Sequence, residues 1–120
     1  MLLNYTTREG NSQEIREIEN WEFVSYPSIC NTYSVWILKG IVTKVNDKKL
    51  DFIRITNTSP IKDWDPKTKT ITTCSGSQYI LGKPSENQMT WWKENNLDPG
   101  TVPNWVTNSN WINKIHWKDI

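Results

Sequence analysis

The residues of this chain that could carry chemistry begin with a hydroxyl-rich turn. Ser75-Gly76-Ser77 lies between two short β-type segments, residues 70–74 and 78–81. Three backbone N–H groups and two hydroxyls in one turn form a nest of donors that can hold a phosphate or a carboxylate without net positive charge. The alternative is a tight hairpin, in which the glycine supplies a positive φ and the serines bond to the backbone. The pattern leaves both interpretations open.

A second polar segment lies upstream and includes Arg54, Thr58 and Ser59. Arg54 is one of three arginines and falls mid-strand, on the same predicted face as Phe52. A guanidinium on an otherwise apolar strand face is costly unless it is paired. Its fork of donors suits a phosphate or the edge of a nucleobase, and it equally suits a carboxylate partner such as Asp51.

Enzymatic and metal-binding patterns are poorly represented. The single histidine, His116, lacks an orienting partner and a nucleophile in the sequence around it. Asp63 and Asp65 flank Trp64 as a carboxylate pair, but no further ligand lies nearby, which favours a solvated loop. We therefore predict no catalytic residue, no metal ligand and no cofactor. A small hydrolase that uses His116 or the Asp63/Asp65 pair is the enzymatic alternative.

Tryptophan is the most unusual component, with eight residues in 120 and no alanine in the chain. Trp21 and Trp36 lie among apolar neighbours and are expected in the core, whereas Trp64 is expected to be exposed. Trp91 and Trp92 are about 100° apart on a helix, so at most one of them points squarely inward. The other is a candidate for stacking on a base or for a subunit interface. A tail with Trp105, Trp111 and Trp117 suits an interface or a cover for the core.

Charge and hydropathy narrow the classes of partner. The 14 basic and 13 acidic residues are interspersed and give a net charge of +1, so no basic surface indicates a long nucleic acid. Mean hydropathy is −0.67, and neither a signal peptide nor a membrane span is evident. We expect a cytoplasmic protein. Because that compartment is reducing, Cys30 and Cys74 are expected as thiols rather than as a disulfide.

The elements that position these residues are mostly β-type. Strands are predicted over 20–26, 32–45 (with a bulge or bend at Gly40), 50–56, 70–74 and 78–81, and a loop over 57–69. A weak short helix is predicted over 11–19, and a convincing one over 85–96, with Met89 and Trp92 on one face. Residues 110–117 fit a strand or a helix. The fold class is therefore mainly β (α+β): one domain over 1–120, with a β-rich part over 20–82 and a helix and Trp-rich tail over 85–120. Its sheet of five to six strands is curled or closed into a barrel, and one helix packs on it.

One stretch of the chain resembles small uncharacterised bacterial and phage or prophage proteins. The resemblance rests on Trp36, Leu38, Gly40 and Val42, then Thr58, Ser59 and Ile61, and finally the string from Thr73 to Pro84, T-C-S-G-S-Q-Y-I-L-G-K-P. Phage proteins of this size and β-rich character include the sponges that sequester cyclic nucleotide signals, such as Thoeris anti-defence proteins. The chain differs from a nucleotide sponge in being poor in arginine and only weakly basic.

The resemblance implies a viral, non-enzymatic anti-defence protein that binds and sequesters a small nucleotide-like signalling molecule as a homo-oligomer in the host cytoplasm. The alternative is a protein–protein inhibitor or immunity-type protein that blocks a nuclease or a defence effector. The predicted ligand-binding residues are Arg54, Thr58, Ser59, Ser75, Ser77, Tyr79, Trp91 and Trp92.

Overall fold

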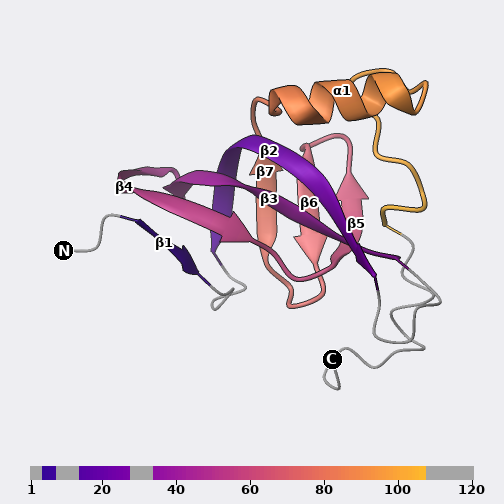
Figure 1. The fold of residues 1–120 in the computed structure, drawn as a ribbon. Helices are drawn as coiled ribbons and strands as arrows, with labels where there is room; N and C mark the ends of the chain where they lie inside the picture. Colours follow the sequence, from indigo (N-terminus) through magenta and orange to yellow (C-terminus); the bar gives the residue numbers. More distant parts are fainter. Residues whose placement is uncertain (1–3, 8–13, 28–33, 108–120) are drawn as a thin grey trace.

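A single β-sheet with one helix packed on it forms the described part of this protein. The computed structural model describes residues 4–7, 14–27 and 34–107. The seven strands lie in the order β1-β4-β3-β2-β7-β6-β5 (Figure 1). The elements are β1 (Asn4–Thr7), β2 (Ile15–Pro27), β3 (Ser34–Val45), β4 (Lys48–Asn57), β5 (Ile61–Asp65), β6 (Thr70–Thr73), β7 (Gln78–Leu81) and α1 (Glu86–Glu94). The predicted fold class is confirmed, and of its two shapes the open sheet is the one found.

The strands of the central meander follow the predicted pattern of side chains. In β4, Phe52 and Arg54 are half-buried, while the alternating residues Asp51 and Ile53 are exposed. This alternation is the period of two expected for a strand with one covered face. The turn that joins β3 to β4 has positive φ at Asn46 (51°) and Asp47 (69°), a conformation that these residue types tolerate well. The connection is therefore a tight hairpin turn between two antiparallel strands.

The helix expected over residues 11–19 is wrong for the residues that the structure describes. Ile15 and Ile18 do not share a face, because Ile15 is 42% exposed and Ile18 is fully buried. Instead Arg16 and Ile18 alternate into the interior as part of β2. This part of β2 pairs with β3 on one side and with β7 on the other, so strand pairing outweighs the local helix-start signal.

Two strands were not predicted from the sequence. β1 pairs in parallel with β4 at one edge of the sheet, and β5 pairs with β6 at the other edge. Residues 57–69 were expected as a loop because they contain Pro60 and Pro66. These prolines lie on either side of β5 rather than inside it, where they leave its ladder intact.

A β-bulge in β2 turns the strand toward the helix. Asn20 and Trp21 together lie opposite Gly40 of β3, because Glu19 pairs with Ile41 and Glu22 pairs with Lys39. The extra residue shifts the face of the strand by one position, so that Trp21 and Phe23 are buried after it, as Arg16 and Ile18 are before it. It also redirects two backbone groups, with Asn20 N bonded to Lys83 O at 2.7 Å and Trp21 O accepting from Ser85 N at 2.9 Å. The bulge thus holds the β7–α1 connection.

Gly40 is required by this close approach of two strands. A Cβ atom at this position would lie 2.9 Å from Ile18 Cγ1 and 3.0 Å from Glu19 O. A bulge or bend was predicted at Gly40 of β3. The structure has a bulge opposite this residue, and its extra residue belongs to β2.

The helix α1 lies across one end of the sheet (Figure 1) and falls within the predicted range of 85–96. Ser85 caps its N-terminus by accepting a bond from Gln88 N at 3.1 Å. Gln88 and Trp92, four residues apart, form its buried side, and Met89 is 44% exposed. Of the two side chains predicted on one face, Trp92 is therefore buried and Met89 lies toward the surface. Among the described residues, no helix is long and apolar enough to cross a membrane.

The core contains tryptophans from the sheet and from the helix. Trp21 and Trp92 are buried, their rings meeting edge to face with centroids 5.8 Å apart. Trp36 is partly buried and packs against the same core, as predicted for it and for Trp21. Trp64, expected to be exposed, is half-buried. Trp111 and Trp117 lie outside the described residues, as do Cys30, His116 and the predicted element at 110–117.

Candidate functional site: an aromatic cleft and a hydroxyl cluster

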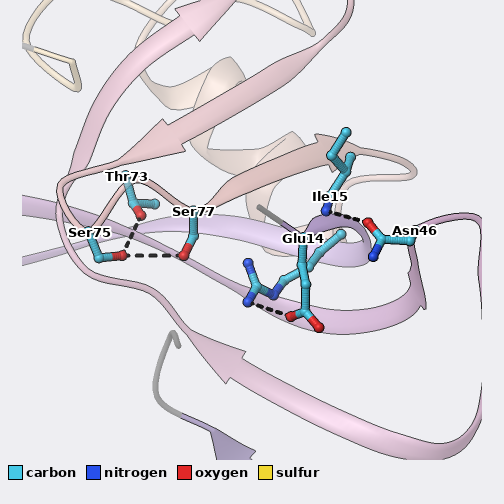
Figure 2. A network of polar contacts seen from close by, with 7 residues as sticks. Glu14, Ile15, Asn46, Thr73, Ser75 and Ser77 are labelled. Carbon is cyan, nitrogen blue, oxygen red and sulfur yellow. Dashed lines mark hydrogen bonds and ion pairs between the residues drawn. The ribbon is translucent and has the colours of Figure 1, made fainter. Parts of the chain in front are cut away.

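Four hydroxyl side chains meet at the turn between β6 and β7. This hydroxyl cluster consists of Ser59, Thr73, Ser75 and Ser77. Ser75 Oγ lies 3.2 Å from Thr73 Oγ1 and 3.3 Å from Ser77 Oγ, as Figure 2 shows. Ser59 Oγ donates to Ser75 Oγ at 3.3 Å, which ties the β4–β5 connection to this turn. The structure therefore brings together three of the predicted ligand-binding residues, Ser59, Ser75 and Ser77.

The backbone N–H groups of Ser75 and Gly76 in this turn are already in use. Gly76 N donates to Thr73 O at 2.9 Å, and Ser75 N donates to Ser59 Oγ at 3.3 Å. Thr73 N donates to Ser77 O at 3.0 Å, which closes a three-residue hairpin loop, and Gly76 has a φ of 91°. This geometry is the tight hairpin of the two interpretations, with a glycine at the left-handed position. An anion at this site would have to displace internal bonds.

Other predicted ligand residues are structural in their surroundings. Thr58 Oγ1 accepts from Leu38 N at 2.9 Å and donates to Ser59 O at 2.8 Å, and the side chain is buried. Tyr79 is 1% exposed. Arg54 is half-buried on β4, where its Cα lies opposite Val42 of β3.

Arg16 is a buried cation that escaped prediction, because residues 11–19 were expected to be helical. Its guanidinium lies 5.5 Å from the centroid of the Tyr79 ring, and its Nη2 is 2.9 Å from Glu14 Oε1. The available signal was its spacing of two from Ile18, which places both residues on the inner face of a strand.

Trp91 and Trp92, which are adjacent in α1, point in different directions, as the angle of about 100° between successive helix residues predicts. Trp92 is buried, and its Nε1 donates to Thr101 O at 2.8 Å. Trp91 is half-buried and forms an aromatic cluster with Trp36 and Trp105, the three pairs of ring centroids being 5.3–5.7 Å apart. Trp105 remains 45% exposed, so this cluster of Trp36, Trp91 and Trp105 reaches the surface.

An apolar cleft of about 390 Å³ lies where α1 meets the β5–β6 hairpin. We call it the tryptophan cleft. Its lining comes from β2, the β5–β6 hairpin, the β7–α1 connection, α1 and the segment after α1: Trp21, Trp64, Pro66, Lys69, Leu81, Gly82, Pro84, Met89, Trp92, Pro99 and Gly100. A cleft of this size with aromatic and apolar walls and few polar groups is typical of a site for a small ligand.

The walls of the tryptophan cleft present few hydrogen-bonding groups of their own. Two of its three indole N–H groups are engaged, because Trp21 Nε1 donates to Gly82 O at 2.9 Å and Trp92 Nε1 to Thr101 O. These bonds also fix the rings in place, so the walls are rigid at two of their three tryptophans. Such a site recognises shape and flat apolar surface before it recognises polar groups.

A second cleft, of about 590 Å³, is larger but has a different character. It lies at the N-terminal end of α1, where it is lined by Glu19, Asn20, Glu22, Lys83, Pro84, Ser85, Glu86 and Asn87. Three carboxylates and one ammonium group give it a polar, acidic lining. This lining does not suit a nucleotide phosphate, and its apolar surface is small, so we regard the tryptophan cleft as the stronger candidate site.

The carboxylates considered for acid–base chemistry lie on the surface. Asp63 and Asp65 are both exposed on β5, and Asp65 Oδ1 accepts from Lys67 N at 3.0 Å. Among the described residues no group of three or more metal-binding side chains converges.

The tryptophan cleft includes one predicted ligand residue, Trp92, and also Trp64, which the sequence marked as exposed. No family model, no curated protein and no solved structure matches this chain.

Proposed function

We propose that this chain is a non-catalytic binding protein that holds a small nucleotide-like ligand in the tryptophan cleft. The observation that carries the proposal is the cleft itself, about 390 Å³ in volume and lined by Trp21, Trp64 and Trp92. Its volume suits a base and a sugar, and flat aromatic walls suit the faces of a base.

Trp64 is the residue best placed to stack on a base. It is half-buried and lines the cleft, whereas Trp21 and Trp92 are buried in the core beneath it. Stacking of one base on an aromatic side chain contributes about 1–3 kcal/mol to binding. A dissociation constant in the micromolar range corresponds to a binding free energy of about −8 kcal/mol, which stacking on Trp64 alone does not supply. The remainder has to come from burial of the sugar and of the other face of the base against the prolines and Met89 of the cleft.

Calorimetry and tryptophan fluorescence against a panel of nucleosides, cyclic nucleotides and ADP-ribose derivatives test this proposal. We expect at least one member to bind, and Trp64→Leu to weaken its binding by about tenfold or more through the loss of stacking. Trp105→Leu is the matched control, because Trp105 is also partly exposed but does not line the cleft. Absence of binding by every member to folded protein would refute the proposal, and so would equal weakening by both substitutions.

A protein partner is the second candidate, and the aromatic cluster supports it. Interfaces are enriched in tryptophan, and Trp105 with Trp36 and Trp91 presents such side chains at the surface. This partner is either a second copy of the chain or a host effector. Light scattering after gel filtration distinguishes the two, since a self-interface gives a mass above 14.1 kDa without any added protein.

The wider role is a proposal that rests on the resemblance to small phage and prophage proteins. In that role the protein sequesters a nucleotide-like signal of anti-phage defence in the host cytoplasm. Because binding alone removes the signal, such a role needs no catalytic residue.

A further inference from the structure

The rim of the tryptophan cleft carries one cation, Lys69, at the end of the β5–β6 turn. It is the single charged residue of the described lining, all other members being apolar or glycine. We infer that Lys69 determines specificity by binding an anionic group, a phosphate, attached to the flat moiety that occupies the cleft. This inference rests on the proposed function, because it assigns the charged part of the same ligand.

The side chain of Lys69 is available for such a contact. It is exposed, and it takes part neither in the Arg16–Glu14 ion pair nor in the Lys44–Glu17 ion pair. The ammonium group is a point charge with three donors on a flexible stem, which suits a phosphate that projects from a cleft into solvent. The indole N–H groups of Trp21 and Trp92 already donate to backbone carbonyls, so neither of them is available to bind an anion.

The backbone of Lys69 gives a second reason to single out this residue. Its φ is 55°, in the left-handed region that favours glycine or asparagine over a long side chain. Its carbonyl accepts from Leu81 N at 2.9 Å, which fixes the residue against β7 beside the cleft. A strained lysine where glycine would be easier is a feature found at functional positions.

The test compares a nucleoside with its 5′-monophosphate, using adenosine and AMP first and then the other bases in the same way. Wild-type protein is expected to bind the monophosphate about threefold to tenfold more tightly than the nucleoside, the range for one exposed charge-assisted contact. Lys69→Met should abolish this preference, so that the nucleoside and its monophosphate bind with equal affinity. Lys67→Met is the matched control: Lys67 lies two residues away on the same turn but outside the lining, so the preference should persist.

Raising the ionic strength provides an independent readout. The preference for the monophosphate should shrink between 0.05 and 0.5 M salt, roughly as the Debye length falls, while nucleoside binding stays constant. Lys69→Gly should lose the preference and also raise the melting temperature, because glycine adopts the left-handed backbone without strain.

The outcomes separate this inference from the proposed function. Equal affinity for nucleoside and monophosphate in the wild type, or a preference that survives Lys69→Met or Lys69→Gly, overturns the role of Lys69 and leaves the aromatic site standing. If no nucleoside and no monophosphate binds, the proposed function itself is wrong, and the inference falls with it.

Discussion

Gln88 connects the helix to the sheet, and its replacement by methionine tests how that connection is made. The side chain is completely buried, and its Oε1 accepts from Phe23 N of β2 at 2.8 Å. Methionine has a similar volume and adapts to irregular surroundings, so packing should change little. The backbone N–H of Phe23, however, would lose its acceptor in the buried interior, which costs about 1–3 kcal/mol.

A smaller opposing effect comes from the other end of the amide. Gln88 Nε2 is buried and has no hydrogen-bond partner in the described structure, so its removal restores part of that cost. We therefore expect a net loss of about 1–2 kcal/mol in the free energy of unfolding. For 120 residues the entropy of unfolding is about 0.25 kcal/mol per kelvin, so the melting temperature should fall by about 4–8 °C.

Thermal and urea denaturation, followed by circular dichroism, measure this change. Lys93→Met is the matched control, since it places the same residue at an exposed position of the same helix and should shift stability by no more than about 0.5 kcal/mol. A Gln88→Met protein as stable as the wild type, or more stable, would show that the bond to Phe23 N does not hold the helix on the sheet.

Three further substitutions have defined outcomes. Gly40→Ala forces a methyl group against Ile18 and should lower stability by about 1–3 kcal/mol in urea denaturation; an unchanged midpoint would mean that the strands are not so close. Thr58→Val leaves Leu38 N without its side-chain acceptor and should cost about 1–3 kcal/mol, which a thermal melt detects and a neutral effect would contradict. Trp105→Phe should remove much of the fluorescence that acrylamide quenches readily, because Trp105 is half-exposed; unchanged quenching would place the accessible indole elsewhere.

The local parts of this fold could be predicted from the sequence, because short-range signals determine them. The β6–β7 hairpin follows from Gly76 between β-type segments, and the start of α1 follows from Ser85 as its cap. A bulge or bend was predicted at Gly40, but the location of the extra residue on β2 could not be predicted in the same way. It depends on Gly40, twenty residues away, and on backbone groups of the β7–α1 connection that accept and donate its displaced hydrogen bonds.

The candidate site was predictable only where it is built from residues close together in the sequence. The hydroxyls of Ser59, Ser75 and Ser77 do meet, since a hairpin and its neighbouring loop bring them together. The tryptophan cleft draws its walls from segments that span residues 21 to 100. No spacing in the sequence relates Trp64 to Pro99, because their proximity is set by how the helix and the chain after it pack on the sheet.

The bulge at Asn20 and Trp21 determines which of the following side chains of β2 face the core. In a regular ladder with β3 that retained Asn20, Trp21 and Phe23 would turn to the opposite face of the sheet, and the bulge is what keeps them on the inner face. Loss of the bulge without loss of a residue would therefore remove Trp21 and Phe23 from the core and Trp21 from the wall of the tryptophan cleft. An inserted residue should therefore be tolerated far more readily in the β5–β6 turn than within β2 at this position.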